Sequence, residues 1–261
     1  MLTPRHVPAS DAQRRFTLTP GALDGRVVLV TGATGGLGTS LCFALAAAGA
    51  TLVLVARSEK KLETLYDALT ESGASTPALV ALAQESATEA DYAELAATIA
   101  TELGGLDALV HTAAAFVAPM PLGDVRHADW QRAMNVNVTA ARLATLALLP
   151  LLETSPLGSV TFLLDHRPGA YWGAYGISKQ AVHALMHMLD DEHEGRRDAA
   201  GHPRIAINGY DPGPMRTALR RRAFPGELES ESPPPYEKLG PLLALLSRAD
   251  RRLTGTPLSH A

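Results

Sequence analysis

The sequence predicts an α/β fold in which a doubly wound parallel sheet forms the middle of three layers, with helices on both faces. Two observations predict it. Short apolar runs alternate with helical stretches from residue 27 onwards, without an internal repeat or a low-complexity tract. The first apolar run also leads straight into a glycine-rich turn that opens a helix. Such alternation is typical of parallel sheets with crossover helices, and it predicts about seven strands in the order 3-2-1-4-5-6-7.

The first strand shows the signal from which the other strands are also recognised. A β-branched run at 27–30 lies between Asp24-Gly25 and Thr31-Gly32, which is typical of a strand buried on both faces. Further strands are expected at 51–56, 77–83, 107–112, 159–164 and 204–208, with a short one near Pro257. Helices are expected from the glycine turn to Ala48, and at 58–72, 88–103, 127–152, 172–194 and 236–248.

The two ends of this pattern define the domain organisation. Residues 1–22 are polar and contain Pro4, Pro8 and Pro20, so we expect a flexible N-terminal arm. Residues 23–261 are expected to form a single domain. Within it, the proline-containing stretch at about 214–240 is expected to form a lid over the substrate.

The composition excludes several classes of function. The chain has 261 residues, of which 46% are hydrophobic, and this is enough for one sizeable core. A net charge of −4 provides no basic surface for nucleic acid. The single cysteine, Cys42, cannot form an internal disulfide and suits a reducing compartment. The sequence has no apolar leader and no uninterrupted apolar run of about 18 residues, so we expect a cytoplasmic protein without a membrane span.

The glycine-rich turn lies between a strand and a helix, the context of a dinucleotide-binding site in a Rossmann-like fold. Gly32 allows the sharp turn, Gly36 lets the main chain approach a pyrophosphate, and Gly38 lets the helix pack against the sheet. The N–H groups at the helix N-terminus then face the phosphates. A P-loop is excluded because no Gly-Lys-Ser/Thr follows. The other residues of the turn expected to contact the cofactor are Thr34, Gly35 and Leu37.

The end of the second strand bears on the choice between NAD and NADP. An acidic residue there would bind the ribose 2′-hydroxyl of NAD and repel the 2′-phosphate of NADP. This strand ends Val55-Ala56-Arg57-Ser58 and has no carboxylate. Arg57 can pair with the phosphate, although a solvated surface arginine is the alternative. The sequence therefore favours NADP(H) over NAD(H).

Tyr175 and Lys179 stand four residues apart, on one face of an expected helix. The unperturbed pKa of tyrosine is about 10, and an ammonium close to a phenol favours the phenolate. We therefore expect Lys179 to lower the pKa of Tyr175 toward neutrality. A phenol of that kind can give a proton to a carbonyl oxygen or take one from an alcohol. The pair occurs by chance in many helices, and the upstream glycine turn gives it its weight.

Together, these motifs resemble those of the short-chain dehydrogenase/reductase superfamily in its common single-domain form. The resemblance runs from about Leu23 to the C-terminus. It rests on Thr31-Gly32-x-x-x-Gly36-x-Gly38, on Tyr175-x-x-x-Lys179 and on Pro212-Gly213-Pro214-Met215-Arg216-Thr217. The runs at 171–175 and 216–220 look like the bacterial YciK-like branch of this superfamily.

The resemblance implies a role for each matching residue. Tyr175 would be the general acid/base, and Lys179 would bind the nicotinamide ribose and lower the pKa of Tyr175. Asn137 would support a proton-relay water through a local helix distortion, with Asn135 as its competitor for that role. The remaining residues implied to hold the cofactor are Ala113, Pro212, Gly213, Met215 and Thr217.

Three departures from the family pattern affect the site. His111-Thr112-Ala113-Ala114 stands where Asn-Asn-Ala-Gly is usual, and the aspartate expected near the adenine after the third strand is missing. The catalytic serine is also missing, because the stretch from Phe162 through Trp172 contains no Ser or Thr. A deletion of about three residues places Asp165 at the position of the serine.

An ionised aspartate only accepts hydrogen bonds, so it would repel the negative charge that develops on a substrate oxygen. Three arrangements are open: Asp165 is protonated and donates, it turns away to pair with Arg167, or the site is catalytically weak. We expect that Asp165 does not directly replace the serine. On this view Asp165→Ser raises kcat/KM for a generic dicarbonyl substrate.

The leading hypothesis is therefore an NADP(H)-dependent oxidoreductase that acts on a small carbonyl or alcohol substrate. The alternative is a nucleotide-binding family member with little turnover and a regulatory or partner-binding role. His183 and His187 have the spacing of zinc ligands, but no Glu or Cys stands in a matching pattern, so no metal site is expected. The resemblance also implies a homodimer or homotetramer formed through the helices at 127–152 and 172–194.

Overall fold

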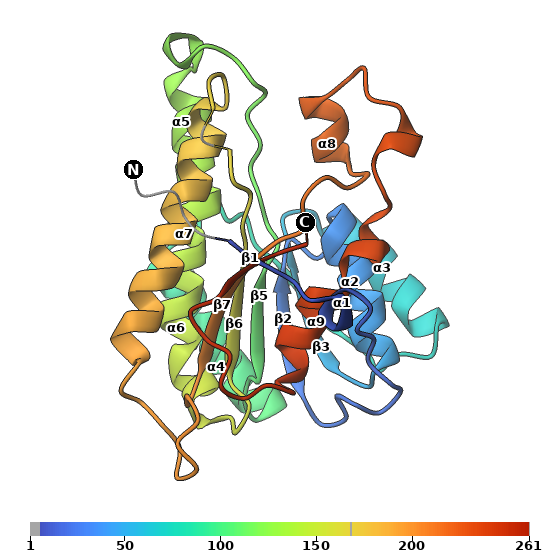
Figure 1. The fold of residues 1–261 in the computed structure, drawn as a ribbon. Coiled ribbons are helices and arrows are strands. Elements are labelled where there is room, and N and C mark those ends of the chain that lie inside the picture. The colour runs from blue at the N-terminus through green and yellow to red at the C-terminus, as the bar shows by residue number, and fades with distance from the viewer. Residues whose placement is uncertain (1–5, 168, 261) are drawn as a thin grey trace.

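A computed structural model describes residues 6–167 and 169–260 of the chain. Their strands form one eight-stranded sheet in the order β1-β8-β7-β6-β5-β2-β3-β4, and all neighbouring strands run parallel (Figure 1). From β2 onwards the order is the expected 3-2-1-4-5-6-7, so the predicted fold is confirmed with one additional strand. The strands are β1 (Val7–Pro8), β2 (Val27–Thr31), β3 (Thr51–Ala56), β4 (Ala78–Ala81), β5 (Ala108–His111), β6 (Ser159–Leu163), β7 (Ala206–Asp211) and β8 (Pro257–Ser259).

Helices cover both faces of this sheet and give the protein two apolar cores. One core lies under α2 (Gly36–Ala47), α3 (Glu59–Glu71) and α9 (Gly240–Ser247). The other lies under α4 (Glu89–Leu103), α6 (Ala140–Thr154) and α7 (Gly173–His193). Two shorter helices, α5 (His127–Met134) and α8 (Ala218–Ala223), stand at one end of the sheet (Figure 1). That end is the one at which the parallel strands have their carboxyl termini, where ligands bind in sheets of this kind.

The N-terminal segment differs from the flexible arm expected at 1–22. Residues 1–5 lie outside the described part of the chain, but residues 7–14 contain β1 and the helix α1 (Asp11–Arg14). β1 pairs with β8, with Val7 opposite Leu258. Both residues of β1 are exposed, so the pairing depends on main-chain hydrogen bonds at the sheet edge. A strand of that kind leaves no apolar signal in the sequence.

Two other boundaries differ from the prediction. The strand expected at 204–208 begins at Ala206 and extends to Asp211, because its far end pairs with β8 from Gly209 onwards. The helix expected at 236–248 begins as a 3-10 turn at Pro235–Lys238 and continues as α9 from Gly240.

The long helix expected at 127–152 is continuous from α5 to α6 but contains a π-helical turn at Asn135–Thr139. A turn of this kind places one extra residue in the helix and is frequent at functional sites. The whole stretch, His127–Thr154, is long and apolar enough by composition to cross a membrane, with 44% of its most apolar window buried. The core helix of a globular domain meets the same criterion, and α6 packs into the core beneath α4 and α7.

The turn after β2 depends on Gly32 for two separate reasons. Its φ of +66° lies in the left-handed region, which favours glycine. A Cβ at this position would also lie 2.6 Å from the main-chain nitrogen of Ala113, just beyond the end of β5. The close approach of the two strand ends forms the floor of the expected cofactor site.

We predict that Gly32→Ala lowers the free energy of unfolding by more than the roughly 1–2 kcal/mol of left-handed strain alone, because the Ala113 main chain must also move. Urea denaturation followed by circular dichroism measures this loss. Gly73→Ala is the matched control, since Gly73 has a φ of +85° but nothing within 4 Å of an added Cβ. Equal losses in the two variants would show that the contact with Ala113 has no energetic role.

Candidate active site

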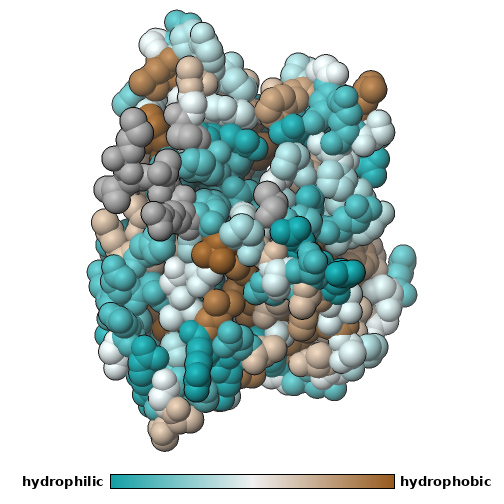
Figure 2. Space-filling view, in the orientation of Figure 1, coloured by the Kyte–Doolittle hydropathy of each residue, from teal (hydrophilic) through white to brown (hydrophobic). Residues whose placement is uncertain are grey.

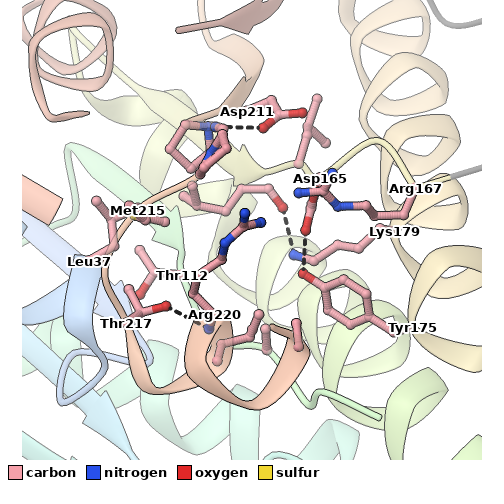
Figure 3. Close-up of a pocket in the computed structure, with 18 of the residues that line it drawn as sticks. Leu37, Thr112, Asp165, Arg167, Tyr175, Lys179, Asp211, Met215, Thr217 and Arg220 are labelled. Atoms are coloured by element: carbon pink, nitrogen blue, oxygen red, sulfur yellow. Dashed lines mark hydrogen bonds and ion pairs between the residues drawn. The ribbon is translucent and has the colours of Figure 1, made fainter. Parts of the chain in front are cut away.

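A pocket opens at the carboxyl ends of β6 and β7, between α7 on one side and α8 on the other. The space-filling view shows the upper side of the molecule hollowed between the parts that carry α5 and α7 and the part that carries α8 (Figure 2). Expected site residues meet in this pocket from four separate segments: Leu37, Asp165, Tyr175, Lys179, Met215 and Thr217 (Figure 3). Lid residues therefore lie opposite the expected catalytic pair.

The glycine turn forms one wall of the site. A Cβ on Gly38 would lie 2.4 Å from the Gly32 carbonyl, and a Cβ on Gly36 would lie 2.9 Å from the methyl group of Thr217. Gly35 is the N-cap of α2 and makes no side-chain capping bond, so the first N–H groups of the helix face the turn without a side-chain partner. Such a cradle fits the phosphates of a dinucleotide.

The threonine that replaces an expected asparagine after β5 supports the same turn. The Thr112 hydroxyl donates to the Thr31 carbonyl at 2.6 Å, and its Oγ1 lies 3.3 Å from the Gly32 carbonyl oxygen. The main-chain path through Ala113 is therefore retained although the asparagine amide is absent. The other expected cofactor residues lie around the cradle: Thr34 in the turn, Arg57 exposed just beyond β3, and Pro212 and Gly213 just beyond β7.

The histidine at the end of β5 is buried and neutral. Its Nε2 lies 2.9 Å from the Thr145 hydroxyl, and its ring stacks on Phe162 at a centroid distance of 4.8 Å. Burial lowers the pKa of His111 to about 3. His111 therefore serves packing between the sheet and α6, and it offers no charge to the site.

Tyr175 donates its hydroxyl proton to Asp165, with 2.9 Å between Oη and Oδ2 (Figure 3). The other carboxylate oxygen forms an ion pair with Arg167 at 2.8 Å, although the Arg167 Nε makes no hydrogen bond of good geometry. The second expected arrangement had Asp165 turn away from the site to pair with Arg167. Asp165 does pair with Arg167, but it remains in the site beside Tyr175. The loop after β6 holds it against the tyrosine.

The pKa of Tyr175 is raised well above its ordinary value, which corrects the expectation that Lys179 lowers it. Burial of the phenol is the largest cause, and the nearby Asp165 carboxylate further disfavours a phenolate. Lys179 is itself buried, which lowers its pKa, and its Nζ donates to the Leu163 carbonyl at 2.8 Å. The ammonium lies 6.0 Å from the centre of the tyrosine ring, and the hydroxyl makes its hydrogen bond to the carboxylate of Asp165.

Burial also raises the pKa of Asp165, with a smaller rise from the Asp211 carboxylate. Arg167, the Tyr175 hydroxyl and Lys179 oppose that rise. The hydrogen bonds do not match the first expected arrangement, in which a protonated Asp165 donates. In the structure the Asp165 carboxylate accepts from the Tyr175 hydroxyl.

Asn137 lies in the π-helical turn, where the local helix distortion was expected. It is buried, and its side chain is fully engaged. Oδ1 accepts from the Ala115 main chain at 2.7 Å, while Nδ2 donates to the Ala115 carbonyl at 3.0 Å and to the Ser178 hydroxyl at 2.8 Å. Asn137 thus fixes the loop after β5 to the helix that carries Tyr175. Asn135 instead makes one exposed hydrogen bond, to the Glu85 carbonyl.

Asp211 is a site residue that the sequence did not single out. Oδ1 accepts from the Gly213 N–H at 2.9 Å and Oδ2 from the His166 N–H at 3.2 Å, so the side chain joins the loops that follow β6 and β7. Asp211 lines the pocket and raises the pKa of both Asp165 and Tyr175. Its place at the end of a strand, directly before Pro212-Gly213, was the available signal.

The segment at 214–240, expected to form a lid, contacts the wall of the pocket through an aromatic side chain. Phe224 lies 6.0 Å from Trp172, measured between ring centroids, and Trp172 lies 6.2 Å from Tyr175. Arg220 stacks on the Phe224 ring at 3.7 Å and forms a bidentate pair with Glu227 at 2.6 and 2.7 Å. The lid is therefore fixed internally, and its aromatic side chain extends the apolar wall above the tyrosine.

Comparison with known proteins identifies relatives over most of the chain. The sequence model of the short chain dehydrogenase family matches residues 26–228. The uncharacterized oxidoreductase YciK of Escherichia coli K12 is 34% identical over 236 residues, which cover 89% of this chain and 90% of that protein. Dehydrogenase/reductase SDR family member 4 of Homo sapiens is 28% identical over 213 residues, covering 80% of this chain and 73% of that protein.

Solved structures show the same fold. A short chain dehydrogenase from Pseudomonas syringae has 37% identity and a TM-score of 0.88, covering 94% of this chain and 98% of its own. A short chain dehydrogenase from Shigella flexneri 2a, crystallised with NADP, has 32% identity and a TM-score of 0.87, covering 93% and 99%. One from Escherichia coli CFT073, crystallised with NADPH, has 33% identity and a TM-score of 0.86, covering 92% and 98%.

We predict that Asn137→Ala lowers the free energy of unfolding by at least about 2 kcal/mol, because it leaves buried main-chain and hydroxyl groups unpaired. Thermal and urea denaturation measure the loss. Asn135→Ala is the matched control from the same π-helical turn and should cost less than about 1 kcal/mol. If the two variants lose the same stability, the Asn137 side-chain amide is not the group that holds the loop after β5 to α7.

Proposed function

The chain belongs to the short-chain dehydrogenase/reductase family and is an oxidoreductase of that family. From this premise we propose that it transfers a hydride between NADP(H) and the carbonyl or alcohol carbon of a small molecule. One observation carries the proposal above the others. The Tyr175 hydroxyl and the Lys179 side chain line the same pocket as Leu37 and Thr217, which adjoin the glycine turn. A proton donor and a dinucleotide cradle thus share one cavity.

The glycine turn, the N-terminus of α2 and the segment after β7 would hold the cofactor, whose nicotinamide supplies the hydride. The cradle fits, because side chains on Gly32 or Gly38 would overlap the main chain that closes it. Lys179 would contact the ribose, while Met215 and Thr217 would adjoin the nicotinamide. Tyr175 would exchange a proton with the substrate oxygen, and Asn137 would keep the proton path in place by holding Ser178 and Ala115.

The proposed preference for NADP(H) rests on Arg57. This side chain is exposed just beyond β3, at the sheet end that carries the glycine turn, and the adjoining strand end has no carboxylate. A guanidinium there can form a charge-assisted pair with a 2′-phosphate. The neighbouring structures crystallised with NADP and NADPH support the same choice.

We predict that NADPH binds more tightly than NADH, and that Arg57→Ala removes most of the difference. A hydrogen bond to a charged group contributes about 1.5–3 kcal/mol, which corresponds to roughly tenfold or more in Kd. Fluorescence titration with each cofactor measures the ratio. Arg142→Ala, which removes another exposed arginine on α6, should leave both Kd values unchanged. Equal Kd values for the two cofactors in the unaltered protein would refute the preference.

We also predict that Tyr175→Phe lowers kcat by about 10²–10⁴-fold while the Kd of NADPH stays nearly unchanged, since general acid catalysis typically contributes that much. Lys179→Ala should impair both turnover and cofactor binding, because Lys179 is proposed to contact the ribose. Stopped-flow measurement of NADPH oxidation separates the two effects. Wild-type kcat in Tyr175→Phe, on a substrate that the unaltered protein turns over, would exclude the mechanism.

One observation favours a second candidate, a nucleotide-binding protein with little turnover. Tyr175 donates its hydroxyl proton to Asp165, and no serine is found among the described residues that line the pocket. Asp165 is therefore proposed not to be a direct replacement for the serine. Tight NADPH binding without oxidation by any substrate in a broad panel would favour this candidate over the enzyme.

We propose a homodimer or homotetramer as the assembly. Leu146 on α6 and Ile177 and Met188 on α7 are large apolar side chains that remain exposed. They lie on the two helices from which the sequence suggested a subunit interface. Burial of these side chains against a second copy would remove apolar surface from water.

A further inference from the structure

The hydrogen-bond capacity of the Tyr175 hydroxyl limits which substrates it can meet. A phenol carries one proton and can also accept hydrogen bonds through its lone pairs. In the hydrogen bond to Asp165 Oδ2, at 2.9 Å, an ionised carboxylate can only accept, so the phenol uses that proton there. The remaining capacity of Oη is that of an acceptor. A substrate group that itself donates a hydrogen bond therefore fits this hydroxyl as it stands.

The surrounding groups maintain this direction. Arg167 lies 2.8 Å from the other oxygen of Asp165, which favours the ionised carboxylate that must accept from Tyr175. Lys179 directs its ammonium at the Leu163 carbonyl. Asp211 adds a second carboxylate to the pocket wall, held by two main-chain N–H groups. The pairing of Asp165 with Arg167 thus leaves an accepting face at the tyrosine.

A carbonyl and a protonated imine place opposite demands on such a face. As a hydride reaches a carbonyl carbon, negative charge grows on oxygen and needs a donor, and an adjacent carboxylate opposes it. A protonated imine carries an N–H donor and a positive charge, and that charge is lost from the substrate as the hydride arrives. The Asp165 carboxylate therefore favours binding of a substrate that is a cation, such as the protonated imine.

We infer that this site takes protonated carbon–nitrogen double bonds, and in particular cyclic iminium compounds with an apolar body, in preference to ketones of the same size. The inference rests on the proposed hydride transfer with NADP(H) and changes the proposed acceptor from the carbon of a C=O group to the carbon of a C=N group. The iminium N–H would donate to Tyr175 Oη, while Asp165 stabilises the cation through the same hydroxyl. Tyr175 contacts the substrate, and Asp165 acts as a positioning residue.

The reaction balances without a further reactant. One C–H bond forms with the hydride of a reduced nicotinamide, and the carbon–nitrogen π bond breaks, its electron pair becoming the lone pair of the nitrogen. The imine takes its proton from water before it binds. The products are a neutral amine and the oxidised nucleotide, so the positive charge passes from the substrate to the nicotinamide.

The rest of the pocket suits an apolar ring. Trp172, Phe224, Leu164 and Leu219 line it above Tyr175. Arg220, a charged residue of the expected lid, donates two hydrogen bonds to Glu227. Its guanidinium is thus already paired with a carboxylate and does not offer an unpaired charge to a substrate anion. A compound with a carboxylate or phosphate would therefore gain little, whereas a hydrocarbon ring adjoining the C=N group can be buried.

The test uses two bicyclic probes of similar size, 3,4-dihydroisoquinoline with C=N and 1-tetralone with C=O, each with NADPH. For the unaltered protein we expect kcat/KM to be at least roughly tenfold higher for the imine, the ratio that a charged hydrogen bond provides. In Asp165→Ser the imine value should fall by roughly 10- to 100-fold. The ketone value should rise in the same variant, by up to the roughly 10²–10³-fold of one oxyanion donor.

Asp165→Asn separates charge from shape, since the amide keeps the size of the side chain and loses its charge. It should lie between the unaltered protein and Asp165→Ser for both probes. Asp67→Ser, on the exposed side of α3, is the matched control and should leave both values unchanged.

A binding measurement gives a readout without turnover. Calorimetry on the NADPH-loaded protein should show tetrahydroisoquinolinium binding at least roughly tenfold more tightly than neutral 1-tetralol, and Asp165→Ser should remove that preference. The inference is overturned, and the proposed function stands, if ketone is reduced as fast as imine and the two ligands bind equally. If neither probe is reduced and NADPH does not bind, the proposed function fails as well.

Discussion

The hydrogen bond from Tyr175 to Asp165 is the interaction on which the chemistry of this site depends. The two oxygens lie 2.9 Å apart, in a buried environment that strengthens electrostatic interactions. A serine in place of Asp165 would leave the tyrosine proton available to a substrate. The carboxylate accepts the hydrogen bond from that proton instead, and together with burial it raises the pKa of the phenol. The same family framework thus carries an acid/base pair with the opposite hydrogen-bond direction.

The scaffold keeps this pair in register through main-chain contacts. Asn137 joins the loop after β5 to α7, and Asp211 joins the loops after β6 and β7. Each of these side chains bonds to main-chain groups, so the positions of the loops depend on the buried Asn137 and the partly buried Asp211. The π-helical turn supplies the extra residue that directs Asn137 inward. The loss of either residue would displace the tyrosine relative to the glycine turn.

The fold could be predicted from the sequence almost completely, and the site only in part. The order of seven strands followed from the alternation of apolar runs and helices, because parallel strands joined by crossover helices follow one common topology. β1 was missed because an exposed two-residue edge strand needs only main-chain pairing. The pKa of Tyr175 was predicted in the wrong direction, since the spacing of Lys179 is visible in sequence while the approach of Asp165 is not.

The sequence by itself determined the glycine turn, the Tyr175 and Lys179 pair and the family, because these depend on residue type at fixed local spacing. Only the tertiary structure decided which charge adjoins the phenol. Asp165 is ten positions from Tyr175, on a loop whose path is set by Arg167 and by the Asp211 contact to His166. Electrostatic effects depend on distance in space and on burial, and both arise only when separate strands bring their ends together.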